Sequence, residues 1–244
     1  MRYIHTGGAV YLSGLSSPTI TNCVFYANTA AIVGGGIAVA ENSAPNIIKT
    51  LMTHSMAGSG GALYIADTTA PRIEECLFTH NVVNKTGGAI TVTGTAAPIF
   101  FNSVIRENSA DRGGGIFVDQ LTDANFTGIQ IMSNTANFGG GGYIYSGSFV
   151  DCNVDFNTAN SSGAGLLLGK FTVSDDPHVL YFYNSSISHN RANSLGKPSS
   201  FPSLPTLPLS IHPSPFPFLL ALPLPLSIRP SPSFNLHKLT NRCM

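Results

Sequence analysis

Residues 60–92 read GGALYIADTTAPRIEECLFTHNVVNKTGGAITV, in which a Gly-Gly-Ala-apolar signature at position 60 returns at position 87. Inside this stretch Leu63 and Ile65 are two positions apart, which is the spacing of a strand with one buried face. The segment FTHN (78–81) closes the unit with an apolar residue followed three positions later by Asn. The stretch therefore indicates one repeat made of short strands.

The same two signatures recur along most of the chain. The glycine signature begins at positions 7, 34, 60, 87, 113 and 140 and, in degenerate form, at 163, and an apolar-x-x-Asn signature follows it in each copy, with Ser for Asn once. Steps of 26 or 27 residues are too short for a βαβ unit or a propeller blade. A coil of short strands that stacks in parallel on the next coil fits this period. We expect an all-β fold, a parallel β-helix of about seven coils over residues 1–196.

Aligning the copies gives three apolar columns that we expect to face the core. The first reads Val10, Ile37, Leu63, Ile90, Ile116, Tyr143 and Leu166. The second reads Leu12, Val39, Ile65, Val92, Val118, Tyr145 and Leu168. The third, in the following strand, reads Ile20, Ile47, Ile73, Phe100, Phe126, Phe149 and Phe182.

Two further columns have structural interpretations. Asn tolerates the left-handed conformation that a sharp corner needs, and stacked amides can hydrogen-bond from coil to coil. Cys23, Cys76 and Cys152 share one column, in which Cys23 and Cys76 are two coils, or about 9.6 Å, apart. That separation is too long for a disulfide, so we expect free, inward-facing thiols. The Asn column reads Asn28, Ser55, Asn81, Asn108, Asn134, Asn157 and Asn190.

The glycine segments Gly7–Val10, Gly60–Leu63 and Gly87–Ile90 match the pattern GGA[V/L/I], and Phe25–Asn28 and Phe78–Asn81 match FxxN. Together these motifs resemble the repeat of the chlamydial polymorphic outer membrane proteins. They are also similar to repeats of the wider right-handed, pectin-lyase-like β-helix class. The resemblance implies a right-handed coil and an adhesin-like role.

The chain changes composition at Lys197. All 25 glycines and all 12 acidic residues precede it, whereas 11 of the 16 prolines follow Gly196. We expect residues 197–244 to be a disordered, Pro-rich, low-complexity tail.

The residues at the boundary suggest an origin for this tail. Gly-Lys can be encoded by GGT-AAG, which contains a splice-donor-like sequence, and Met1 enters in the middle of a coil. We interpret the tail as translated intron and the repeats as truncated at both ends, which implies a eukaryotic source. A genuine Pro-rich linker is the alternative.

One polar column is the best candidate for chemistry. It holds His54, His80, Glu107 and Ser133 on successive coils, about 5 Å apart, just before the Asn column. Such a row could bind a metal ion or place an acid and a base across a sugar. The competing interpretation is a solvated corner without function.

Two acidic pairs are weaker candidates. Glu41 and Asp67 stack on neighbouring coils as a candidate Ca²⁺ pair. Asp175 and Asp176 resemble the paired aspartates of polygalacturonases, but the Gly-His-Gly and Arg-x-Lys elements of those enzymes do not accompany them in this sequence. We therefore expect neither a metal nor a cofactor.

Composition and short motifs bound the remaining functions. Twelve Lys+Arg balance twelve Asp+Glu, so charge suggests no nucleic-acid partner. The sequence shows no signal peptide and no apolar run long enough to cross a membrane.

We expect a stalk or adhesin-like module of a secreted or cell-surface protein, with surface glycans or extracellular proteins as partners and with end-to-end self-association. A polysaccharide lyase or glycoside hydrolase is the alternative. Glycosylation sequons begin at Asn84, Asn125, Asn160 and Asn184.

Overall fold

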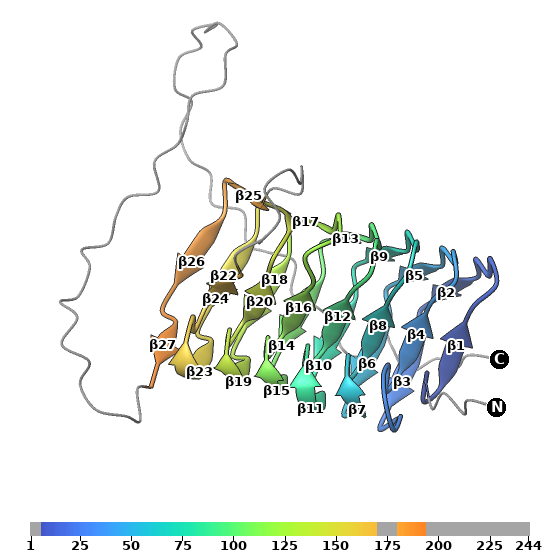
Figure 1. Cartoon of the computed structure of the whole chain (residues 1–244), viewed down its shortest axis with the longest axis horizontal. Helices are drawn as coiled ribbons and strands as arrows, with labels where there is room; N and C mark the ends of the chain where they lie inside the picture. The colour runs from blue at the N-terminus through green and yellow to red at the C-terminus, as the bar shows by residue number, and fades with distance from the viewer. Residues whose placement is uncertain (1–5, 170–179, 194–244) are drawn as a thin grey trace, which may run out of the picture.

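The computed structural model describes residues 6–169 and 180–193, and the regular elements of these segments are 27 short β-strands, without a helix. Each coil passes through up to four strands in turn, and equivalent strands of successive coils form four parallel sheets that run the length of the solenoid (Figure 1). The prediction of an all-β parallel β-helix is confirmed. Seven strands in each of three sheets correspond to about six full turns.

The four sheets are numbered in the order in which a coil visits them. The first contains β1 (Val10–Leu12), β4 (Ile37–Val39), β8 (Leu63–Ile65), β12 (Ile90–Val92), β16 (Ile116–Val118), β20 (Gly142–Ile144) and β24 (Leu166–Leu168). The second contains β2 (Thr19–Thr21), β5 (Asn46–Ile48), β9 (Arg72–Glu74), β13 (Ile99–Phe101), β17 (Asn125–Thr127), β21 (Gly147–Val150) and β25 (Leu180–Tyr183). The third contains β3 (Val24–Tyr26), β6 (Leu51–Thr53), β10 (Leu77–Thr79), β14 (Val104–Arg106), β18 (Gln130–Met132), β22 (Asn153–Asp155) and β26 (Ser186–Ser188). The fourth contains β7 (Met56–Ser59), β11 (Val82–Thr86), β15 (Ser109–Arg112), β19 (Thr135–Phe138), β23 (Thr158–Ser162) and β27 (Arg191–Ala192).

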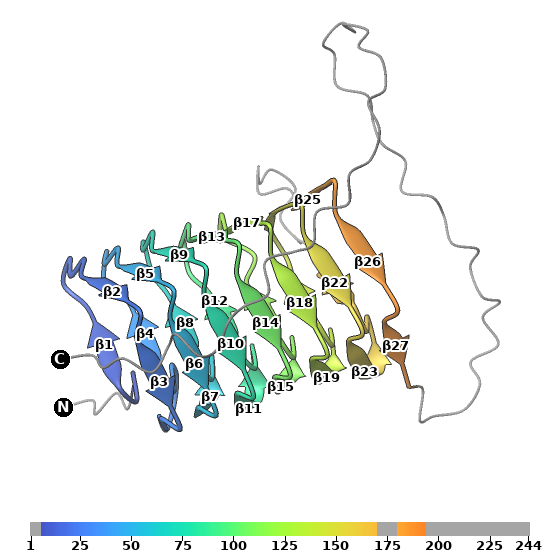
Figure 2. The same ribbon diagram turned by 180° about the vertical axis from the view of Figure 1, so that it is seen from behind.

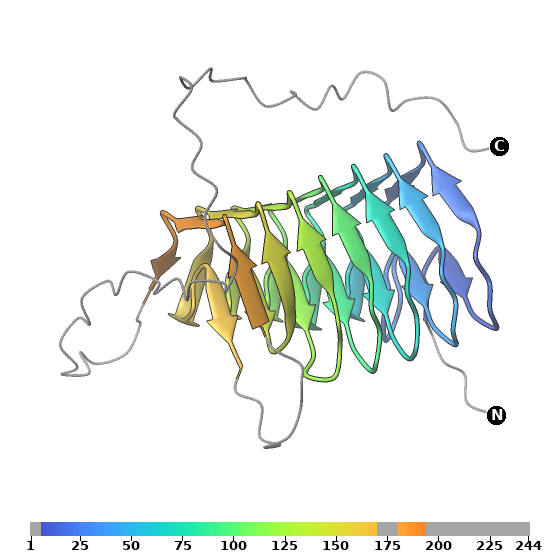
Figure 3. The same cartoon turned by 90° about the horizontal axis from the view of Figure 1, so that it is seen from above.

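The core is a set of side-chain ladders between these sheets. Phe100, Phe126 and Phe149 are fully buried and stack with ring centroids 4.8 and 4.6 Å apart. The third apolar column is therefore confirmed, and its strands pair in the predicted register. Seen from behind and from above, equivalent strands lie side by side from one end of the rod to the other (Figures 2 and 3). Each coil thus buries its apolar side chains against its neighbours.

The first two columns are correct except on the sixth coil. Ile116 pairs with Gly142 and Val118 with Ile144, so the predicted inward positions of Tyr143 and Tyr145 are wrong by one residue. Four successive glycines, 139–142, allow two alignments, and Gly139 rather than Gly140 takes the left-handed corner, with φ of 68°. This choice places an isoleucine in the core and leaves both phenols outside, where their hydroxyls need no buried partner.

The cysteine prediction holds at two of three positions. Cys76 and Cys152 are buried and free, which also excludes the Cys23–Cys76 bond that would contradict the register. Cys23 is half-buried and disulfide-bonded, so the expectation of a free thiol is wrong there. It lies in the first described coil, where its sulfur is more accessible than the two sulfurs enclosed between coils.

Two predicted regions lie outside the described residues. These are the Pro-rich tail at 197–244 and the acidic pair Asp175 and Asp176, together with the start of the chain at residues 1–5. The last described strand is β27.

Candidate functional site

The predicted polar column lies at the corner between the third and fourth sheets. There each coil turns at a single residue with positive φ, a conformation that costs a residue with a side chain about 1–2 kcal/mol. The turn directs the side chain out of the solenoid, and we call these residues the corner column. Its members and their φ values are Ala27 (54°), His54 (56°), His80 (55°), Glu107 (57°), Ser133 (55°), Phe156 (53°) and His189 (49°).

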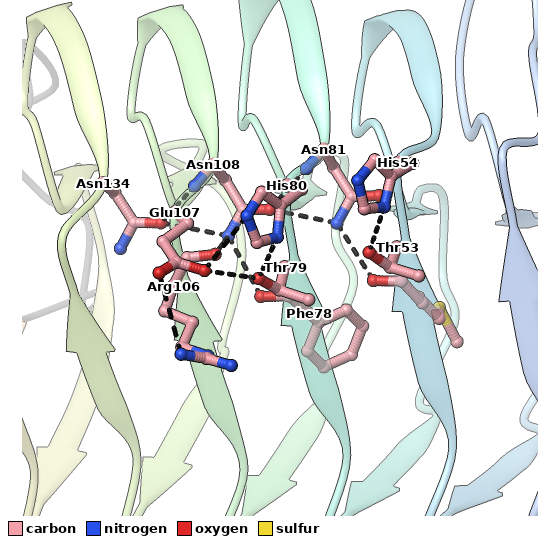
Figure 4. A network of polar contacts seen from close by, with 11 residues as sticks. Thr53, His54, Phe78, Thr79, His80, Asn81, Arg106, Glu107, Asn108 and Asn134 are labelled. Atoms are coloured by element: carbon pink, nitrogen blue, oxygen red, sulfur yellow. Dashed lines mark hydrogen bonds and ion pairs between the residues drawn. The ribbon is translucent and has the colours of Figure 1, made fainter. Parts of the chain in front are cut away.

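The Asn column follows directly and faces inward. Asn108 Oδ1 accepts hydrogen bonds from the backbone N–H and the Nδ2 of Asn81, at 2.9 and 3.0 Å. Asn108 Nδ2 in turn donates to Asn134 Oδ1 at 3.0 Å and to the Phe78 carbonyl at 3.1 Å (Figure 4). The predicted amide ladder is confirmed, but the left-handed residue is the one before each Asn, not the Asn itself. The ladder satisfies backbone groups that the sharp corner would otherwise leave buried and unpaired.

Two histidines of the corner column stack on each other. The rings of His54 and His80 are nearly parallel, at 4°, with centroids 5.0 Å apart. Each ring is fixed by the threonine before it, because Thr53 Oγ1 and Thr79 Oγ1 lie 2.7 Å from the respective Nδ1 atoms. The predicted row of histidines therefore exists as an ordered pair on neighbouring coils (Figure 4).

Glu107 completes the row on the next coil. Its Oε2 lies 3.3 Å from His80 Nε2 and accepts a hydrogen bond of 3.1 Å from Thr79 Oγ1. Arg106 approaches the other carboxylate oxygen, with Nη1 3.7 Å from Oε1. The Thr79 hydroxyl donates to Glu107, so the Thr79 oxygen is free to accept a hydrogen bond from His80 Nδ1.

The contacts of His80 and Glu107 are exposed to solvent and do not form a metal site among the described residues. His80 and Glu107 side chains are 49% and 39% exposed, so water competes for every polar contact that they make. Within residues 6–169 and 180–193, no group of three or more His, Cys, Asp and Glu side chains is placed to hold a metal ion. Ser133 continues the column on the next coil.

The second predicted pair also lies at a corner. Glu41 and Asp67 have positive φ, at 52° and 58°, and Asp67 Oδ2 accepts a hydrogen bond of 3.1 Å from the Glu41 backbone N–H. The Asp67 carboxylate therefore caps the neighbouring corner. Its charge is stabilised by this N–H, which is a structural use of the carboxylate that the Ca²⁺ hypothesis did not consider.

The four sequons lie on strands or strand ends. Asn84 and Asn160 are exposed on the fourth sheet, in β11 and β23. Asn184 is exposed just after β25, and its Nδ2 donates to Asp151 Oδ1 at 2.5 Å. Asn125 is half-buried in β17, where its Oδ1 accepts a short hydrogen bond of 2.6 Å from Ser148. The first three are accessible to a modifying enzyme, whereas the fourth is partly covered.

Two features were missed at the level of sequence. Asp155 Oδ1 lies 2.9 Å from His189 Nδ1, and the His189 ring stacks on Phe156 at 4.9 Å, so the corner column has a second ring pair near its end. Phe117 and Tyr143 form an aromatic group on the outside of the first sheet, with ring centroids 5.7 Å apart. The sequence signal for this group is the position between the two buried columns, which is Tyr or Phe in four copies of the repeat.

A helix of the length and apolar character needed to cross a bilayer is not found in the described parts of the chain.

Comparison with known proteins places the chain by its fold. No curated protein and no solved structure matches it significantly. A family model described as "Right handed beta helix region" matches residues 8–187, which includes all the coils from the first glycine corner to β26. The chain therefore belongs to the right-handed β-helix family.

Proposed function

We propose that this chain is a non-enzymatic β-helix module of a secreted or cell-surface protein, used as a rigid stalk or as an adhesive surface. The observation that carries the proposal is the way in which the candidate catalytic groups are used. His80, Glu107 and Thr79 bond to one another across neighbouring coils on an outward-facing corner. Enzymes instead aim such groups into a site from which water is excluded, where each interaction is worth more.

The coil-to-coil contacts support a mechanical role. Aromatic, amide and backbone ladders connect every described coil to the next, so that a load along the rod is shared among many parallel contacts. Among the described strands, β1, β2 and β3 lie at the edges of their sheets, and edge strands are templates for pairing with another chain. End-to-end association of copies or of further coils is part of this proposal, and sedimentation velocity over a range of concentrations tests it.

A secreted or surface location is supported by the exposed sequons at Asn84, Asn160 and Asn184. The test is a gel-mobility shift of the endogenous protein after treatment with peptide-N-glycosidase. A shift is expected. An unmodified protein recovered from the cytosol would contradict this part of the proposal.

The alternative is a polysaccharide lyase or glycoside hydrolase, and the contact between His80 and Glu107 is the observation that favours it. Most glycosidases need two carboxyl groups on either side of the bond. The corner column supplies one carboxylate, flanked by imidazole and guanidinium groups.

Turnover decides between the two candidates. The full chain is incubated with polygalacturonate, galactomannan and mixed-linkage β-glucan, and new reducing ends are counted. A His80→Ala/Glu107→Gln double variant is the matched control, because both positions are exposed and tolerate substitution. We expect no difference between the two proteins. Release of products that the double variant fails to give would establish an enzyme.

A further inference from the structure

The outside of the first sheet carries aromatic side chains in one column. In the observed register Tyr11, Tyr64, Phe117 and Tyr143 occupy the middle position of their strands, whose flanking residues face the core. Small residues lie between the first three, and Ala38 is 1% exposed. Rings two coils apart are separated by about 9.6 Å, so the column forms an intermittent aromatic row along the rod axis.

The row is densest at its C-terminal end. Phe117, Tyr143 and Tyr145 form a triangle of rings with centroid distances of 5.7, 6.3 and 5.2 Å. All three side chains are half-buried, so their edges are held by the sheet and part of each ring remains accessible. The Tyr145 hydroxyl donates to the Tyr143 hydroxyl at 3.2 Å. We call these three residues, together with Asp119, the aromatic platform.

Asp119 gives the platform its charge. It is half-buried in the coil before Tyr145, where its carboxylate accepts hydrogen bonds from Thr93 Oγ1 at 3.2 Å and from the Gln120 backbone N–H at 2.8 Å. The hydrogen bond to Tyr143, burial and the nearby carboxylate together raise the pKa of Tyr145 to about 12. The phenol therefore remains protonated and able to donate at physiological pH.

The adjacent acids decide what the platform can accept. Asp67 and Asp119 both act electrostatically on Tyr64, the next ring along the row, and burial with these carboxylates raises its pKa. Arg112, a base that also acts electrostatically on Tyr145, lies with its Nε 3.8 Å from Asp111 Oδ2. Negative charge beside accessible rings repels an anionic polymer, whereas carboxylates accept hydrogen bonds from hydroxyl groups. Apolar sugar faces pack on aromatic rings, and binding sites commonly combine such rings with a few polar groups.

We propose that the aromatic platform binds a neutral polysaccharide, which stacks on Phe117, Tyr143 and Tyr145, hydrogen-bonds to Asp119 and follows the row toward Tyr64. This inference rests on the proposed function, because it names the partner of an adhesive surface. The carboxylates of Asp67 and Asp119 repel a polyuronate, so a neutral chain is the expected occupant.

Affinity gel electrophoresis of the full chain tests the proposal. Native gels contain galactomannan, xyloglucan or mixed-linkage β-glucan as neutral probes, polygalacturonate as the acidic probe, or no glycan. Tyr143→Ala and Tyr64→Ala are compared with Tyr183→Ala, a matched control because Tyr183 is a tyrosine that is 72% exposed on the second sheet. Circular dichroism verifies that each variant keeps its strands.

At least one neutral glycan is expected to retard the wild-type chain, and Tyr143→Ala is expected to weaken this binding about 10-fold, while Tyr183→Ala leaves it unchanged. The proposal is overturned if no neutral glycan retards the chain, if polygalacturonate retards it more, or if Tyr143→Ala and Tyr183→Ala behave alike. It is equally overturned if Tyr143→Ala only abolishes self-association, because the platform would then be a contact between copies. None of these outcomes concerns turnover, so failure here is distinguishable from failure of the non-enzymatic assignment.

Discussion

Glu107 and Asn108 are neighbours in the chain, but they belong to two different kinds of column. Asn108 is 1% exposed and makes hydrogen bonds to the coils on both sides, through both atoms of its amide. Glu107 is 39% exposed and pairs with His80 and Arg106, whose side chains are 49% and 38% exposed. The comparison teaches that repetition in a solenoid does not by itself identify function. The inward column makes buried hydrogen bonds between coils, whereas the outward column makes contacts with which water competes.

The largest expected effect comes from Asn108→Ala. The variant leaves the Asn81 backbone N–H and Nδ2, as well as the Phe78 carbonyl, without their partners in a buried site. We expect a loss of about 3 kcal/mol in the free energy of unfolding, measured by urea denaturation. Asn137→Ala is the matched control, since Asn137 also bonds to coils on both sides but is exposed. Equal losses in the two variants would contradict the comparison.

The second effect is a pH dependence of the free energy of unfolding, which we expect from the buried Cys76 thiol. Burial raises the pKa of the Cys76 thiol from 9.0 to about 11. Above pH 9 the unfolded chain loses this proton while the folded chain retains it, so stability falls as pH rises from about 9 to about 11. The loss amounts to about 3 kcal/mol. Urea denaturation of the wild type and of Cys76→Ala over this range measures it.

The difference between those two proteins is the informative quantity, because other buried groups titrate in the same range. Cys76→Ala removes the contribution of this thiol and is expected to give the shallower curve above pH 9. Parallel curves would mean that the thiol is exposed to water in the folded protein.

A smaller effect of opposite sign is expected where the ladder is interrupted. Ser55 is fully buried in the Asn column, and only its backbone N–H reaches Asn81 Oδ1, at 3.0 Å. Ser55→Asn would add an amide that donates to Asn81 Oδ1 and accepts from the preceding coil. We expect a gain of about 1 kcal/mol in the same urea experiment. A loss would show that this coil lacks the space that the other coils give to Asn.

The smallest effects belong to the corner column. His80→Ala and Glu107→Gln remove exposed contacts, and each is expected to change the free energy of unfolding by less than about 0.5 kcal/mol. Differential scanning calorimetry of the two variants beside the wild type measures this. A loss of several kcal/mol from either one would place the corner column among the structural columns.

The sequence predicts the parallel β-helix because its apolar ladders repeat with the strand period. Phe100, Phe126 and Phe149 occupy the positions assigned to them. The misplacement of Tyr143 has a physical cause, since residues 139–142 are all glycine and lack a side chain that would distinguish the two alignments. Only the requirement to bury Ile144 and expose the phenols selects one of them.

The candidate site was partly predictable. Stacking of His54, His80 and Glu107 follows from the repeat length alone. The hydrogen bonds of His54 and His80 to the threonines that precede them do not, because they depend on the left-handed turn at each corner residue. That turn was assigned to the Asn column, since Asn is the residue that tolerates it best in isolation. The ladder instead holds Asn inward and transfers the strained conformation to its neighbour.

Amide hydrogen exchange at Asn81, followed by NMR in the wild type and in Asn108→Ala, tests the central claim most directly. The Asn81 N–H donates to Asn108 Oδ1 at 2.9 Å, so a structural ladder predicts slow exchange in the wild type, at the rate of the core strands. In Asn108→Ala this amide should exchange faster than the core amides of distant coils. An Asn81 amide that exchanges at the same rate in both proteins would contradict the assignment of the Asn column as the element that holds the coils together.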